Sequence, residues 1–269
     1  MKVVLFCGGL GMRLYPSTEN TPKPLVSVGG QPILLQLMKY YSYFGHKEFI
    51  LCLGYKGESI KEFFLNYDEC LRGDFVLSGG KKKHRLFKSD LEDWKITFAE
   101  TGLNSTAGER LLAVKKYVGE DEMFLANYSD GLTDLHLPDL IDFAIKRGKI
   151  GTFITVKPSV AFHYVSSNKE DYVEDICQLN QTDLRINGGF FVFKNQIFDY
   201  INPGEDLVIE PFRRLIKKHE LVAYKHDGFW ASLDTYKDKQ RLDELASKNA
   251  STWEIWNNHK KSNGNTAHE

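Results

Sequence analysis

Residues 2–14 read KVVLFCGGLGMRL and decide how this chain of 269 residues is organised. The apolar run Lys2–Cys7 predicts a buried strand, and the glycines after it predict a tight loop at its carboxyl end. Glycines there let backbone N–H groups turn toward an anion without obstruction by a Cβ. Arg13 adds a forked cation that suits phosphate oxygens. The stretch therefore predicts a phosphate-binding loop at the end of a buried strand.

Strand-like and helical runs alternate along the rest of the chain. Apolar runs predict strands at residues 48–53, 123–126, 151–156 and 189–193. Helices are expected at residues 31–44, 59–64, 108–118, 137–147 and 233–246. This alternation predicts an α/β fold, a Rossmann-like and mostly parallel sheet flanked by helices. Ligands of such sheets bind over the carboxyl ends of the strands, where the first loop is expected to lie.

A single domain is expected over residues 1–256, with two segments that depart from the pattern. Residues 68–93 are charged and contain KKKHR at positions 81–85, which predicts an inserted, hairpin-like arm. The arm is either a solvated surface feature or a contact that covers the nucleotide or a second subunit. Residues 257–269 are polar and are expected to fray.

Composition excludes several kinds of partner. The formal net charge of -1 gives no overall basic balance that would point to nucleic acid or an anionic membrane as a partner. No apolar run reaches the roughly 18–20 residues that span a bilayer, and no signal peptide is recognised. The four cysteines form no C-x-x-C pair and are expected to be reduced thiols, which favours a cytoplasmic protein.

Three further residues carry chemistry. Lys23 lies between two prolines, Pro22 and Pro24, which hold the loop and hence the lysine. A fixed lysine beside a glycine loop can neutralise charge as a phosphate is transferred. Asp130 follows the strand at residues 123–126, and Asp234 precedes the last helix. If both reach one place they form a two-carboxylate Mg²⁺ site, although Asp234 alone is equally compatible with a helix N-cap.

These elements together resemble the sugar-1-phosphate nucleotidyltransferase family, and within it the glucose-1-phosphate cytidylyltransferase branch. Other phosphate motifs fit worse, because the chain has neither G-x-x-x-x-G-K-[ST] nor G-x-G-x-x-G. The resemblance runs from Met1 to about Trp256 and rests on these stretches: Pro22-Lys23-Pro24, Gly54-Tyr55-Lys56-Gly57, Asp93-Trp94, Glu100-Thr101-Gly102, Gly108-Glu109-Arg110-Leu111, Tyr128-Ser129-Asp130-Gly131, residues 186–191 (INGGFF), Gly228-Phe229-Trp230 and Asp234-Thr235.

The resemblance implies an enzyme that transfers CMP from CTP to a small phosphorylated acceptor, releases pyrophosphate and requires Mg²⁺. The product would be a CDP-activated precursor for surface polysaccharide, and the enzyme a homo-oligomer with a small β subdomain on the acceptor side. The implied catalytic residues are Arg13, Lys23 and Asp130. The implied nucleotide-binding residues are Gly8, Gly9, Gly11, Met12, Arg13, Lys23, Arg110 and Ser129. The implied acceptor-binding residues are Asn187, His163 and Gln178, and the metal ligands are Asp130 and Asp234.

The chain departs from the family pattern mainly on the acceptor side. Met12 replaces the usual threonine of the first loop. Leu179 stands where the family carries a lysine that contacts the acceptor phosphate, and His163 ends a segment that is usually Arg-Phe-Gly. Replacement cations could come from Lys157, Lys169 or Arg185.

These departures leave several functions open. The acceptor is glucose 1-phosphate by closest resemblance, another sugar phosphate, or a non-sugar phosphate such as phosphoglutamine. A catalytically silent regulatory paralogue that binds nucleotide is the alternative from another class. A nicotinamide-dependent oxidoreductase is disfavoured by the glycine spacing.

Overall fold

The computed structural model describes residues 1–9, 14, 21–67, 91, 93–159 and 162–257, and the backbone of residues 75–78 and 83–86. Gly11, Met12 and Arg13, to which the sequence assigns phosphate binding, lie outside the described residues. Most of the charged segment at residues 68–93 and the polar end from residue 258 also lie outside them.

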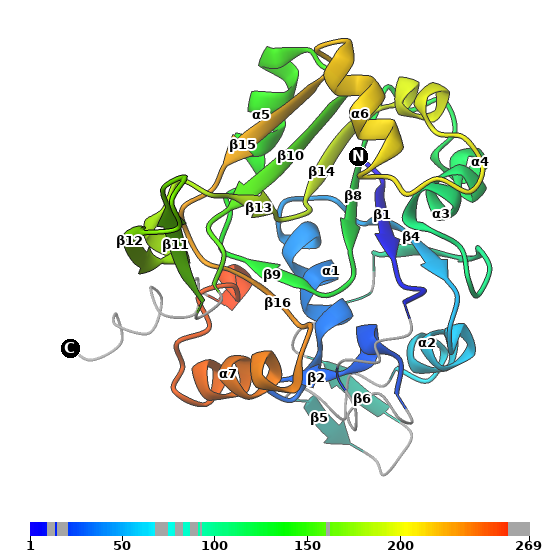
Figure 1. Ribbon diagram of the computed structural model, residues 1–269. Helices are drawn as coiled ribbons and strands as arrows, with labels where there is room; N and C mark the ends of the chain where they lie inside the picture. Colours follow the sequence, from blue (N-terminus) through cyan, green and yellow to red (C-terminus); the bar gives the residue numbers. More distant parts are fainter. Residues whose placement is uncertain are drawn as a thin grey trace.

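An eight-stranded sheet forms the centre of the molecule, in the order β13-β10-β14-β8-β1-β4-β7 with β15 paired to β10 (Figure 1). The strands β8, β1, β4 and β7 are parallel, and β14 runs antiparallel to β8 and β10. The predicted mostly parallel sheet is confirmed. The strand bounds are β1 Val3–Phe6, β4 Glu48–Leu53, β7 Lys95–Glu100, β8 Met123–Tyr128, β10 Gly151–Val156, β13 Ile186–Asn187, β14 Phe191–Lys194 and β15 Leu221–Lys225.

Helices cover both faces of this sheet because its strands are apolar on both sides. In β1, Val3 and Leu5 pack with α1, α2 and α5, whereas Val4 and Phe6 pack with α3, α4 and α6. Such continuous apolar runs are typical of parallel strands buried on two faces. The helix bounds are α1 Ile33–Tyr43, α2 Gly57–Leu65, α3 Ala107–Ala113, α4 Lys115–Val118, α5 Leu137–Arg147, α6 Glu210–Lys217 and α7 Tyr236–Ser247.

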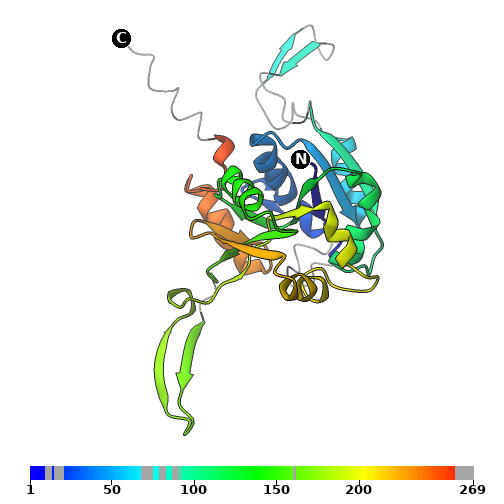
Figure 2. The same cartoon turned by 90° about the horizontal axis from the view of Figure 1, so that it is seen from above.

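Four short pairs of strands surround the main sheet. The pair β9–β16 and the helix α7 share a third apolar cluster with Trp253. The hairpin β11–β12 projects away from the body of the molecule (Figure 2). The bounds are β2 Ser27–Val28, β3 Gln31–Pro32, β5 Phe75–Ser78, β6 Lys83–Leu86, β9 Gly131–Thr133, β11 His163–Ser167, β12 Val173–Gln178 and β16 Trp230–Ser232, and the 3-10 turns are Lys23–Leu25, Leu179–Gln181, Asn195–Tyr200 and Ile255–Asn257.

The predicted helices form, with shifted ends. The helix expected at residues 31–44 begins at Ile33, because Gln31 and Pro32 pair with β2, and Gly45 follows its end at φ 85°. The helix expected at residues 108–118 is divided into α3 and α4 at Val114. The helix expected from residue 233 begins at Tyr236, where Thr235 and Asp238 form a capping box. Within the described chain, no helix is both long and apolar enough to cross a bilayer.

Candidate active site

Lys23 lies between the two aspartates at the carboxyl end of the sheet. Its ammonium pairs with Asp130 and donates a hydrogen bond to Oδ1 of Asp234 at 2.9 Å. Only 15% of the lysine side chain is exposed. Burial alone would lower the pKa of this ammonium, but the two carboxylates more than offset burial and leave its pKa raised. The lysine is therefore a fixed positive charge at neutral pH.

Local strand pairing brings the two aspartates together across 104 positions of sequence. Asp130 follows β8 and Asp234 follows β16, and β16 pairs with β9 so that Ser232 lies opposite Gly131. The backbone N–H of Leu233 donates to the carbonyl of Asp130 at 3.0 Å. Ser232 Oγ donates to Oδ2 of Asp234 at 2.7 Å and orients that carboxylate. The structure thus brings together the two carboxylates and the lysine that the sequence selects.

The pair of carboxylates fits a magnesium ion that arrives with a phosphate. Both contact one ammonium, so the two carboxylates lie close enough together to face one small cation. Mg²⁺ prefers such oxygen donors and is usually held by one or two carboxylates together with substrate phosphates. Among the described residues no cluster of three or more acidic, histidine or cysteine side chains could hold the metal. Phosphate oxygens would have to complete the coordination.

Lys23, Asp130 and Asp234 are called the triad from here on. A cavity of about 610 Å³ lies beside this triad, over the ends of β1, β7 and β8. Five of the predicted nucleotide-binding residues line it. It also carries three carboxylates, from Asp130, Asp206 and Asp234. Its described lining comprises Phe6, Gly8, Gly9, Lys23, Pro24, Leu103, Asn104, Ser105, Thr106, Ala107, Arg110, Tyr128, Ser129, Asp130, Asp206 and Asp234.

Arg110 lines this cavity but directs its guanidinium to the protein. The side chain is buried, with the residue 5% exposed. Its two terminal nitrogens donate to five oxygens at the ends of three parallel strands. The acceptors are the carbonyls of Gly8 at 3.2 Å, Leu53 at 3.1 Å, Gly102 at 2.9 Å and Leu103 at 3.2 Å, and Oγ1 of Thr101 at 2.7 Å.

This guanidinium explains two of the glycines in the sequence motifs. A Cβ on Gly8 would lie 2.1 Å from Cζ of Arg110, and one on Gly54 would lie 2.8 Å from its Nη1. Both positions therefore leave room for the arginine. Arg110 holds the loop at the end of β1 in place, a role that the sequence did not assign to it. Ser129 is similar, since its hydroxyl donates to the carbonyl of Phe6 at 2.9 Å.

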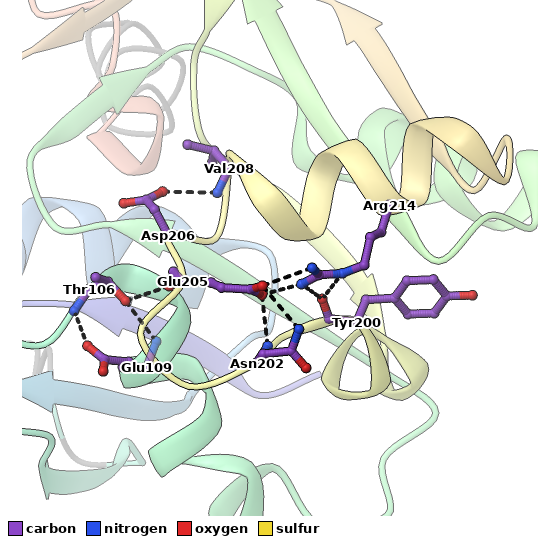
Figure 3. A network of polar contacts seen from close by, with 8 residues as sticks. All are labelled: Thr106, Glu109, Tyr200, Asn202, Glu205, Asp206, Val208 and Arg214. Carbon is purple, nitrogen blue, oxygen red and sulfur yellow. Dashed lines mark hydrogen bonds and ion pairs between the residues drawn. The ribbon is translucent and has the colours of Figure 1, made fainter.

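Sequence reasoning missed the loop at residues 201–209, which brings Asp206 to the cavity. Figure 3 shows the hydrogen bonds that hold this loop in place. Oγ1 of Thr106 donates to the carbonyl of Glu205 at 2.6 Å. The Glu205 carboxylate pairs with Arg214 and accepts from the backbone N–H of Asn202 at 2.9 Å, which together hold its pKa at about 2.

Asp206 and Gly108 belong to the same loop contact. The carboxylate of Asp206 accepts from the N–H of Val208 at 3.1 Å (Figure 3). A Cβ on Gly108 would lie 2.4 Å from the Glu205 carbonyl, so the glycine of the Gly108-Glu109-Arg110 motif permits this approach. Gly108 was the one residue of the sequence motifs that signalled this close contact between the start of α3 and the loop at residues 201–209.

A second cavity, of about 910 Å³, adjoins the first at the two aspartates. Tyr128, Asp130 and Asp234 line both cavities, and Asn187 lines the second. Burial raises the pKa of Tyr128 to about 12, and its side chain also shares a hydrogen bond with Asn187. The rest of the described lining is Asn127, Gly131, Ser159, Phe162, Ile186, Gly188, Trp230, Ala231, Ser232, Thr235, Lys237, Asp238, Arg241 and Leu242.

Two predicted acceptor residues do not line this second cavity. His163 and Gln178 lie opposite each other at the base of the hairpin β11–β12, and both are exposed. The backbone N–H of Gln178 donates to Oε1 of Gln181 at 3.2 Å. The hairpin that carries them projects away from the body of the molecule (Figure 2), and neither residue is among the described lining of the cavity.

The fold and this pair of cavities define the class, an α/β protein with adjoining cavities over the carboxyl ends of parallel strands. The chain belongs to the Nucleotidyl transferase family, which matches residues 2–238. It is 38% identical over 258 residues to the glucose-1-phosphate cytidylyltransferase of Salmonella typhimurium (strain LT2) and likewise to that of Salmonella typhi, covering 95% of this chain and 100% of each relative. An apo UDP-glucose pyrophosphorylase structure shares the fold, with a TM-score of 0.70 and 16% identity over 93% of this chain and 99% of that one.

Proposed function

We propose that the protein transfers CMP from CTP to glucose 1-phosphate and releases pyrophosphate. The observation that carries the proposal is the meeting of two cavities at Asp130 and Asp234, the two carboxylates that contact Lys23. A nucleotide in the first cavity and an acceptor in the second would put their reacting phosphates at this junction. The choice of CTP and glucose 1-phosphate is supported by the full-length relatives named for that activity.

The reaction requires alignment and charge neutralisation. An oxygen of the acceptor phosphate attacks the α-phosphorus of CTP, a new P–O bond forms, and the bond from the α-phosphorus to the bridging oxygen breaks as pyrophosphate leaves. The acceptor phosphate is already anionic at neutral pH, so no side chain has to remove a proton. Holding both reactants in line and stabilising the charge of the transition state are the remaining requirements.

Each residue of the triad has a role in this scheme. Lys23, held by its prolines and charged at neutral pH, would contact the phosphate oxygens that gain charge during transfer. Asp130 and Asp234 would hold Mg²⁺, which when bound polarises the phosphoryl group and eases departure of pyrophosphate. Arg110 would keep the loop of Gly8 and Gly9 in the shape that presents its N–H groups. Arg13 is proposed as a further phosphate ligand on the grounds of sequence alone.

Measurement of pyrophosphate release tests the proposal. The purified protein is mixed with each of CTP, UTP, GTP, ATP and dTTP, with Mg²⁺ or EDTA, and with a panel of phosphorylated acceptors that includes glucose 1-phosphate and phosphoglutamine. We expect release with CTP, glucose 1-phosphate and Mg²⁺. Asp130→Asn should lower the rate by roughly 10²–10³-fold, whereas Asp139→Asn, on the exposed face of α5, should not.

The outcomes separate the alternatives. Release of pyrophosphate with CTP and only a non-sugar phosphate would show that the enzyme is a cytidylyltransferase with an acceptor other than glucose 1-phosphate. Tight CTP binding without release for any acceptor would favour the regulatory paralogue and refute the enzyme. The polysaccharide precursor role, a cytoplasmic location and a homo-oligomeric state complete the proposal, and mass measurement in solution checks the last of these.

A further inference from the structure

A phosphorylated acceptor in the second cavity needs cationic partners, and the position at which the family carries its acceptor-phosphate lysine is Leu179 in this chain. Three carboxylates, from Asp130, Asp234 and Asp238, line it. Among its described lining residues only Lys237 and Arg241 are basic. Lys23 lines the first cavity instead and is already in contact with two of the carboxylates. A phosphate monoester that enters must therefore find its positive partners on α7, the helix that carries both basic residues.

The three substitutes considered from the sequence do not face this cavity. Arg185 pairs with Asp227 and donates to the carbonyls of Thr155 at 3.2 Å and His226 at 3.3 Å. Lys157 lines a separate cavity of about 290 Å³. Lys169 lies in the exposed turn of the β11–β12 hairpin, away from the body (Figure 2). None of them can replace the lysine whose place Leu179 takes.

Lys237 and Arg241 have the placement that a phosphate site requires. They are one helical turn apart, so both side chains leave α7 on the same face. Both are exposed, and within the described chain neither forms an ion pair. In the part of the chain that the structure describes, the neighbouring Asp238 forms no ion pair with either of them, and its carboxylate accepts instead from the N–H and the hydroxyl of Thr235, each at 2.8 Å. An ammonium and a forked guanidinium are therefore available for phosphate oxygens.

The position of α7 relative to the triad is also suitable. The helix begins two residues after Asp234, so the first cation is three positions from a proposed metal ligand. We propose that Lys237 and Arg241 bind the phosphate of the acceptor and hold it against the junction of the two cavities. This inference rests on the proposed function, and it assigns the acceptor phosphate to α7 instead of the base of the hairpin.

Substitution on one helix tests the inference with an internal control. The test variants are Lys237→Gln, Arg241→Gln and the double variant. The control is Lys239→Gln, which removes the same charge from α7 but from a lysine that pairs with Asp243 at 2.6 Å and does not line the cavity. Each charge-assisted hydrogen bond lost should raise the KM for the acceptor by roughly ten- to a hundredfold. The KM for CTP should change less than twofold, and Arg241→Lys should recover part of the loss.

Calorimetric binding of glucose 1-phosphate gives a result that does not depend on turnover. The titration is done with Mg²⁺ and a non-hydrolysable CTP analogue present. Binding to wild type and Lys239→Gln, with loss in the double variant, supports the inference. Equal binding to all three overturns it, as does the absence of binding to wild type. Failure of pyrophosphate release together with α7-dependent binding would refute only the proposed reaction.

Discussion

Replacing Arg110 with methionine should destabilise the whole carboxyl edge of the sheet. Methionine fills much of the same volume but removes the N–H groups that meet five oxygens from β1, β4 and β7. With a net value of about 1 kcal/mol for each hydrogen bond, the four N–H groups on the terminal nitrogens account for roughly 3–5 kcal/mol.

The expected change is large enough to measure by thermal unfolding. For a protein of this size each kcal/mol shifts Tm by about 2–4 °C, so the variant should melt roughly 6–20 °C below wild type. The matched control is Arg213→Met, since Arg213 is exposed on α6. CTP binding, followed by calorimetry, should also weaken because the loop of Gly8 loses its anchor.

Two results would contradict this reasoning. If Arg110→Met melts within about 2 °C of the Arg213→Met control, the guanidinium does not hold the strand ends together. If that variant binds CTP poorly without any loss of Tm, the arginine acts directly on the nucleotide, as the sequence resemblance implied. Only a loss of both stability and CTP affinity agrees with the contacts in the structure.

Three further predictions follow from the same contacts. Gly8→Ala should lower Tm well below that of Gly9→Ala, because a Cβ on Gly8 would meet the buried guanidinium at 2.1 Å whereas one on Gly9 has no atom of the described residues within 4 Å; equal values would contradict this. Asp234→Asn should raise the Mg²⁺ concentration for half-maximal pyrophosphate release and lower the pKa of Lys23, and an unchanged Mg²⁺ requirement would argue against a metal ligand. In the folded state the pKa of Glu205 is lowered from 4.5 to about 2. Its ion pair therefore stabilises the protein at pH values above the unfolded pKa of 4.5, and this contribution is lost as the pH falls from about 4.5 to about 2. The Tm of Glu205→Gln should therefore be below that of wild type at pH 7 and approach it near pH 2, and a constant difference would refute the assignment.

The parts of the fold that sequence predicted are those with a local chemical signature. Apolar runs bounded by glycine predicted β1, β4, β8 and β10, and periodicity with an end signal predicted α1 and α5. The strand β7 was missed because its residues are only partly buried at the edge of the sheet. A small β subdomain was expected on the acceptor side, but the sequence did not place its strands β11 and β12, because the hairpin is exposed almost throughout and lacks a buried face to impose alternation.

The candidate triad was predictable because each member has a constraint that can be read locally. Prolines flank Lys23, a buried strand precedes Asp130, and a capping box follows Asp234. What brings them together is the pairing of β9 with β16, which the sequence did not reveal because each strand has only three residues. The roles of Arg110 and Asp206 could not be predicted either, since both depend on carbonyls and loops that are distant in sequence.

On the acceptor side, the position of a residue in a sequence motif predicts the phosphate-binding residues less well than the charged side chains that line the cavity. The family resemblance directs attention to Gln178 and His163, but both lie on exposed strands, which can change direction without cost to the core. The helix α7 has less freedom, because Leu242 is buried in the cluster with Trp253 and fixes which face of the helix is turned to the cavity. Lys237 and Arg241 are therefore held on a helix whose orientation is fixed by the core, and they are the basic residues among the described lining of the cavity. This is the reason to look for the acceptor phosphate at these two side chains.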